Sequence, residues 1–316
     1  AGFVSRGVQT YVATAIEGEY VQFWTSRVTQ DLQTLGLRGN YQDTITFGNT
    51  ERGVDFLMEV TYDKFDGYAV GTVVADFART DADAVFNIVG LQSLPSGEVQ
   101  KVAGINVTDA DALSINVTGG NTRIENLAGS EVESLTLAAD ADLTIVSTLM
   151  ANVESIDASG VAGEVDITVD PADNFSFVGS EGGSSLTFAE DESFTATDDP
   201  QIEGDQTSID GGVGGVVITL GEDADVDLTE AILTNVTGVV LGDDSELSLT
   251  MAQAAAIGAE NFSVATGDEA YLNLTGLDGE PFALADYADG ITVAVLTVAD
   301  LPEVTLHPDT DLTGIG

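Results

Sequence analysis

Apolar and polar residues alternate along most of this chain in a repeated strand–turn–strand unit. Two copies, VESLTLAADADLTIVS (Val132–Ser147) and VESIDASGVAGEVDITVD (Val153–Asp170), begin 21 residues apart and share a short turn rich in Asp, Ala and Gly. Alternation with a period of two predicts strands with one buried face. Three further copies follow the same pattern: Val102–Gly119, Val236–Ala252 and Asn261–Leu277.

A unit of this size cannot bury its apolar face alone, so we expect the copies to stack into a mainly β, solenoid or β-helix-like domain. The alternative is an antiparallel β-sandwich in which each unit is a hairpin. Residues 171–210 fit the repeat poorly and predict a break or an insertion. The lead-in segments supply apolar anchors at Leu127, Leu149, Ile232 and Leu233. The predicted inward residues are Leu135, Leu137, Leu143, Ile145, Ile156, Ile167, Val239, Leu241, Leu247, Leu249, Val264, Leu272 and Leu274.

The first 95 residues have a different pattern, which predicts a small α+β domain ahead of an acidic repetitive β domain over 96–316. Apolar residues spaced by three and four predict a helix over 7–37, and residues 81–89 suggest a second, short helix. Three strands are expected between these helices, because the segments are β-branched and aromatic: Tyr41–Phe47, Gly53–Tyr62 and Tyr68–Phe77. Pro95 marks the boundary.

Charge divides the chain at nearly the same place. All eight Lys and Arg residues lie at or before Arg123, where 15 acids leave a net charge of −7, and residues 124–316 carry −39. This acidity argues against nucleic acid and anionic membranes as partners, since both need a positive surface. Few lysines and many aspartates are typical of halophile proteins, whose self-repulsion is screened by salt.

Acidic clusters are the weak candidates for metal binding. Asp223, Asp225, Asp227, Asp243 and Asp244 could bind calcium or another cation, because calcium takes oxygen ligands, although no cluster has EF-hand spacing. The segment SIDGGVGGVVITL (Ser208–Leu220) resembles one degenerate copy of the glycine-rich nonapeptide of calcium-binding β-rolls, with Gly215 where Asp is expected. The alternative is a set of solvated acidic corners, and no cofactor is required.

The sequence offers little support for an enzyme. A polysaccharide lyase built on a β-helix would need a basic residue to take the α-proton, and the repeat region holds only Lys101 and Arg123, both at its beginning. His307 is the sole histidine and has no serine in a G-x-S-x-G elbow to partner it. There is no nucleotide-binding fingerprint and no cysteine, and no apolar run is long enough for a membrane helix, so membrane insertion is not expected.

Half of the twelve asparagines lie in N-x-S/T sequons, all in the repeat region. The sequons permit glycosylation in a secreted protein, although strands rich in Val and Thr also generate N-V-T by composition. The candidate positions are Asn106, Asn116, Asn174, Asn235, Asn261 and Asn273.

The V-E-S-L-T-L strands, the D-A-D turns and the L-S-L-T-M-A-Q segment (Leu247–Gln253) resemble the β-repeat regions of microbial surface-layer, adhesin and phage virion proteins over Val99–Leu277. The resemblance implies an extracellular or virion-surface structural protein. We expect a virion component such as a capsid-decoration, tail or fibre protein, which contacts itself and other structural proteins through residues 1–95. The alternatives are a surface-layer or filament subunit and a secreted adhesin or carbohydrate-binding module.

Overall fold

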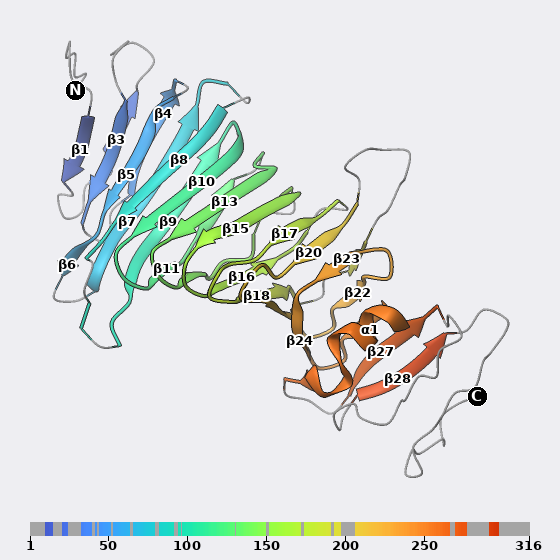
Figure 1. Ribbon diagram of the computed structural model, residues 1–316. Coiled ribbons are helices and arrows are strands. Elements are labelled where there is room, and N and C mark those ends of the chain that lie inside the picture. The colour runs from blue at the N-terminus through green and yellow to red at the C-terminus, as the bar shows by residue number, and fades with distance from the viewer. Residues whose placement is uncertain are drawn as a thin grey trace.

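A computed structural model describes the chain at residues 10–14, 21–24, 33–39, 42, 44–51, 53–63, 66–79, 82–91, 94–95, 97–129, 131–149, 152–171, 174–190, 193–196, 206–265, 269–276 and 291–296. Within these ranges the protein is mainly β, and its strands wind into a solenoid (Figure 1). We call one circuit of the chain around the solenoid a coil.

Each coil places one strand in each of two parallel sheets. Sheet A has ten strands, which stack in this order: β1 (Thr10–Thr14), β3 (Thr34–Arg38), β5 (Asp55–Glu59), β8 (Ala82–Val89), β10 (Ala110–Thr118), β13 (Ser134–Ala139), β15 (Ser155–Val161), β17 (Ser176–Val178), β20 (Ser208–Asp210) and β23 (Ile232–Thr234). Sheet B stacks β2 (Val21–Trp24), β4 (Thr44–Thr50), β7 (Gly67–Phe77), β9 (Gln100–Thr108), β11 (Thr122–Ile124), β14 (Leu143–Ile145), β16 (Val165–Val169), β18 (Ser184–Phe188), β21 (Val216–Leu220), β24 (Val236–Leu241) and β26 (Phe262–Val264), with β6 (Thr61–Asp63) beside β7 and β12 (Leu127–Gly129) beside β9.

A third face begins late in the chain. Sheet C stacks β19 (Ser193–Thr195), β22 (Asp225–Asp227), β25 (Glu246–Thr250), β27 (Ala270–Thr275) and β28 (Ile291–Leu296). The described helices are α1 (Met251–Ile257) and the short 3-10 helix η1 (Ala259–Asn261), which lie in the last coils. The longest strands, β7 to β10, lie toward the N-terminal end, and α1, β27 and β28 lie at the opposite end (Figure 1).

The strands of successive coils pair in parallel and in register, as predicted for a solenoid. Leu135 pairs with Ile156 and Ile156 with Phe177, so these coils keep the 21-residue spacing of the sequence repeat. Every described strand pair is parallel except β6 with β7, so the two strands of a repeat unit lie in different sheets and are not hairpins. The sandwich alternative is therefore wrong for the repeat.

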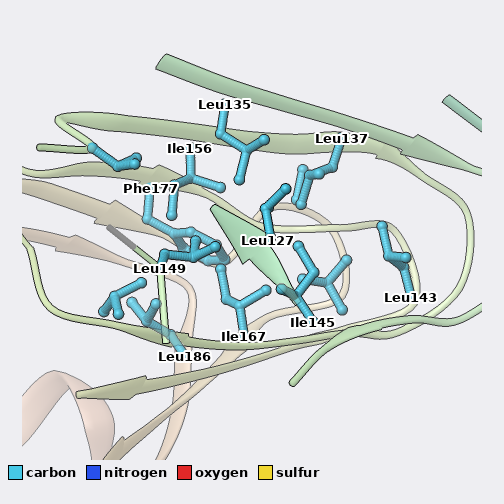
Figure 2. Close-up of a cluster of buried hydrophobic side chains, with 14 of the residues drawn as sticks. Leu127, Leu135, Leu137, Leu143, Ile145, Leu149, Ile156, Ile167, Phe177 and Leu186 are labelled. Carbon is cyan, nitrogen blue, oxygen red and sulfur yellow. The ribbon is translucent and has the colours of Figure 1, made fainter. Parts of the chain in front are cut away.

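The core runs as one cluster between the sheets, and Figure 2 shows its middle section, where Leu135 and Ile156 of sheet A face Ile145 and Ile167 of sheet B. Every predicted inward residue is buried except Val264, which is half-buried against the core. The anchors Leu127 and Leu149 are also buried. Ile232 is 50% exposed and Leu233 half-buried, so the prediction fails for Ile232.

The prediction of N-terminal helices is wrong in the parts of 7–37 and 81–89 that the structure describes. Within 7–37 it has β1, β2 and the start of β3, and the short helix predicted over 81–89 is β8. The apolar spacing fitted a helix, but these segments are rich in Val, Thr, Tyr and Phe, and parallel pairing of β1 with β3 and β5 with β8 decides their conformation. The described part of 1–95 is therefore β and continues both sheets, while its separation as a domain stays a prediction. The strands predicted around β4, β5 and β7 are confirmed.

The wide N-terminal core is filled by phenylalanines. Phe56 stacks on Phe86 with ring centroids 4.8 Å apart and meets Phe77 edge-on at 5.9 Å. The segment 171–210, predicted as a break or an insertion, contains β17, β18 and β19, and sheet C begins here. Phe177 pairs with Ile209, so this coil is 32 residues long instead of 21. Phe188 and Phe194 pack at 5.6 Å across the new corner between sheets B and C.

Helix α1 occupies the place in its coil where a strand of sheet A would otherwise follow β25. Thr250 and Gln253 form a capping box at its N-terminus. The Gln253 Nε2 amide also donates to the carbonyl oxygens of Leu228 and Ala231, each at 2.8 Å, in the preceding coil. Gln253 thus joins the helix to the segment that leads into β23.

Gln100 fills the corner between sheets A and B in the wide part of the solenoid. Its side chain is fully buried, and its Nε2 donates to the carbonyl of Gly120 at 2.9 Å. A Cβ added at Gly90 would lie 1.3 Å from the Gln100 Oε1, so this corner closes only over a glycine.

We predict that Gly90→Ala lowers the free energy of unfolding by about 1–3 kcal/mol, because the added methyl overpacks a buried side chain. Gly238→Ala is the matched control, since its added Cβ has its nearest neighbour at 3.5 Å, an ordinary contact. Denaturant unfolding of both variants measures the difference. Equal stability of the two variants would contradict the packing of this corner.

Gln253→Glu keeps the shape of the side chain but replaces the amide donor with a carboxylate that faces two carbonyl oxygens. We expect a loss of about 1–3 kcal/mol at neutral pH. Part of the loss is regained near pH 4, where an ordinary glutamate begins to protonate and can donate again. Thermal unfolding of the variant and the parent at both pH values tests this, and a pH-independent difference would show that the two carbonyl contacts do not matter.

Candidate functional site

In-register stacking arranges acidic residues into columns on the outer surface. Asp111, Glu133 and Glu154 occupy one position in three successive coils, where the Glu133 amide donates to the Asp111 carbonyl at 2.9 Å and the Glu154 amide to the Glu133 carbonyl at 2.8 Å. All three residues are exposed. Adjacent strands lie ~4.8 Å apart, so like charges in such a column repel one another.

Other carboxylates reduce this cost by accepting hydrogen bonds between coils. The Asp142 carboxylate accepts from the Asn121 side-chain amide at 2.7 Å on one side and from the Glu164 backbone amide at 3.0 Å on the other. A carboxylate that accepts such bonds helps to hold the corner together as well as carrying charge.

The predicted metal candidates lie on two successive coils at the corner between sheets B and C. Asp223 and Asp244 occupy equivalent turn positions with positive φ angles of 57° and 52°, a conformation that Asp tolerates. The Asp223 amide donates to the carbonyl of Asp243 at 3.0 Å, which stacks the two turns. Asp225 starts β22 beside Glu246 of β25.

Asp227 is engaged locally, because its Oδ1 accepts from the amide and hydroxyl of Thr229 at 2.9 and 2.6 Å. In the described part of the chain no group of three or more His, Asp or Glu side chains is arranged to hold a metal ion. The structure brings Asp223, Asp225, Asp243 and Asp244 to one corner and places Asp227 at the other end of β22, without converging their oxygens on a point. Calcium binding there stays a prediction.

Tyr271 lies in the same region, next to Glu246 in the column of sheet C. Its hydroxyl donates to the Glu269 carboxylate at 2.9 Å. This hydrogen bond, with the negative charge of Glu269, raises the pKa of Tyr271 above its usual value near 10, and Asp244 and Glu246 add to the effect. The phenol therefore stays a neutral donor at neutral pH.

The glycine-rich segment 208–220 forms the corner between β20 and β21. The Asp210 Oδ1 accepts from the Gly212 amide at 2.9 Å and from the Asn235 side chain at 3.0 Å. Its carboxylate thus closes its own turn and joins it to the next coil. Gly215, which stands where the β-roll pattern expects Asp, has a φ of 80°.

The sequons occupy different environments. Asn235 and Asn261 are exposed at corners, Asn174 precedes β17, and the remaining three lie within strands: Asn106, Asn116 and Asn273. At least four of the six side-chain amides donate within the chain, and a glycan on any of them would leave that amide a single N–H donor: Asn116 to Asn87, Asn235 to Asp210, Asn261 to the Ile257 carbonyl and Asn273 to Glu246. Glycosylation stays a prediction.

Sequence reasoning missed the two glutamines that lock corners. For Gln253 a signal existed, since T-x-x-Q before an alanine-rich segment is a capping box, whereas the residues just before it were predicted as the end of the strand unit Val236–Ala252. For Gln100 no local pattern was available, because its glycine partners come from other coils. His307 lies outside the described residues.

A shallow pocket of about 210 Å³ lies at the opposite edge of sheets A and B from Gln100, lined by Thr50, Glu51, Ala78, Arg79 and Ala82. None of the helices in the described ranges has the length and apolarity needed to cross a bilayer.

Comparison of the chain with protein-family models, with curated proteins and with solved structures found no match.

We predict that Glu133→Gln raises the melting temperature at low salt by about 1–2 °C, because it removes a charge between two like charges in a column. The gain should vanish near 1 M NaCl, where the Debye length is about 3 Å. Glu181→Gln is the control, since Glu181 is also exposed but stacks by its amide on Val161. An equal gain from both variants would mean that net charge, and not the column, sets the repulsion.

Proposed function

We propose that this chain is a non-enzymatic structural protein of an exterior assembly, most specifically a virion component of the capsid-decoration, tail or fibre group. The observation that carries the proposal is the continuous ladder: one core cluster runs from Leu35 of β3 to Leu274 of β27, first between sheets A and B and then also against sheet C. A linear stack of coils around an unbroken core suits an extended, projecting body.

The charge distribution supports the same role. Residues 124–316 carry −39 and present acids in columns, so this part repels other copies and other acidic surfaces. Residues up to Arg123 carry both signs and a net charge of −7, which suits contact with neighbouring subunits. In the assembly, the solenoid would project into solvent outside the cell or on the virion surface, while its N-terminal coils make the contacts.

A surface-layer or filament subunit is the second candidate within this class, because the same ladder and charge suit a lattice. Both candidates predict an ordered array of copies.

Immunogold labelling of this chain on negatively stained material from the native source tests the proposal. We expect gold on virions at a regular position. Gold on cell-surface arrays or filaments would select the second candidate. Label found only on dispersed monomers would contradict a structural role in any assembly.

A further inference from the structure

Exposed apolar side chains gather at one edge of the solenoid. Among the described residues, the large apolar side chains that are exposed include Tyr62 (66%), Val89 (42%) and Leu91 (45%) in the N-terminal coils. Val146, Val213 and Ile232 are also exposed, but they are scattered over the acidic coils. We call the first three residues, with the half-buried Tyr68, the corner patch.

The corner patch is formed by two successive coils at the edge where the chain passes from sheet A to sheet B. Glu59, the last residue of β5, pairs with Val89 of β8, and the next amide, of Val60, donates to the Val89 carbonyl at 2.9 Å. Tyr62 lies two residues after Val60, and Leu91 lies two residues after Val89. In Figure 1 the hairpin of β6 and β7 lies at this edge.

The patch is held in a fixed conformation. Tyr62 lies opposite Tyr68 in the antiparallel β6–β7 pair, with ring centroids 5.2 Å apart, and Tyr68 packs on the core. Beside Leu91, the Gly90 amide donates to the Thr118 carbonyl at 2.9 Å, over the buried Gln100. Apolar groups that are already ordered lose little entropy when a partner covers them.

Charges of both signs border the patch. Lys101 pairs with Ala69, the residue after Tyr68, and it makes no ion pair with any residue in the described ranges. Asp66 and Glu98 lie at the same corner, where the Glu98 carboxylate is 3.8 Å from the place of a Cβ on Gly67. A surface with both signs is complementary to itself in a two-fold contact, in which residue i of one copy meets residue j of the other and the reverse.

The distribution of net charge also favours a second copy of this chain as the partner of the corner patch. Two copies that meet through residues 124–316 bring −39 against −39, whereas the part up to Arg123 carries only −7. A self-contact therefore has its lowest repulsion in the N-terminal coils, where the exposed tyrosine and leucine lie. This argument rests on the proposed function, in which these coils do the assembling.

We propose that the corner patch is a two-fold contact surface for a second copy of this chain. Tyr62, Val89 and Leu91 form its apolar centre, and Lys101 faces the acids of the partner copy at its rim.

The absence of cysteine from the sequence makes a direct test possible, because a single introduced cysteine can react only with itself in another copy. Tyr62→Cys and Leu91→Cys are treated with a short bis-maleimide in the full-length chain at high salt. Val213→Cys, 90% exposed on an acidic coil, is the control. We expect covalent dimers from at least one patch variant and none from the control. Dimers from neither patch variant, or equal dimer yields from all three, would overturn the proposal.

Sedimentation of the parent chain and of the double variant Tyr62→Ser/Leu91→Ser gives a second readout. We expect the parent to sediment as a dimer and the double variant as a monomer, while a parent that stays monomeric contradicts the contact. Failure here leaves the proposed function intact if gold still marks an ordered assembly, because other surfaces would then join the copies. If the parent chain dimerises but gold marks no ordered assembly, the contact between copies is supported and the proposed function is contradicted.

Discussion

The structure depends on the in-register parallel pairing of successive coils. Backbone hydrogen bonds between coils set each residue above its equivalent in the coil before. The alternation of the strands then sends every second side chain inward, so that Leu135, Ile156 and Phe177 form one continuous column of the core. The same register sends equivalent acids outward, one above another. Stability of the core and electrostatic repulsion at the surface therefore have a single geometric origin.

Corners are where the coils are adjusted to one another. Gln100 fills a corner against Gly90 and Gly120, and Gln253 joins α1 to the coil below. Asp142 and Asp210 use carboxylates for the same purpose. Part of the acidic content is thus structural, and the remaining exposed acids define the surface that other molecules meet.

The repeat could be predicted from the sequence because period-two alternation is a local signal, and because two copies that begin 21 residues apart share the same strand–turn–strand pattern. They identified nearly all of the inward residues from Leu135 to Leu274 correctly. The first coils could not be predicted in the same way, since the apolar spacing over 7–37 fits a helix as well as it fits the strands β1, β2 and β3. Only pairing with distant strands decides between them. The weak candidate site was located at one corner, but its hydrogen bonds, such as Asp227 to Thr229, depend on three-dimensional detail.

The central claim is the register of the ladder over many coils, and a distance between spin labels at Ser114→Cys and Asp210→Cys tests it most directly. These residues are 96 positions apart in the sequence but belong to one column that passes through Thr136, Asp157 and Val178. Four strand spacings of ~4.8 Å predict a label separation of about 20 Å. A distribution centred at roughly 30 Å or more, well beyond that ladder spacing, would contradict the solenoid.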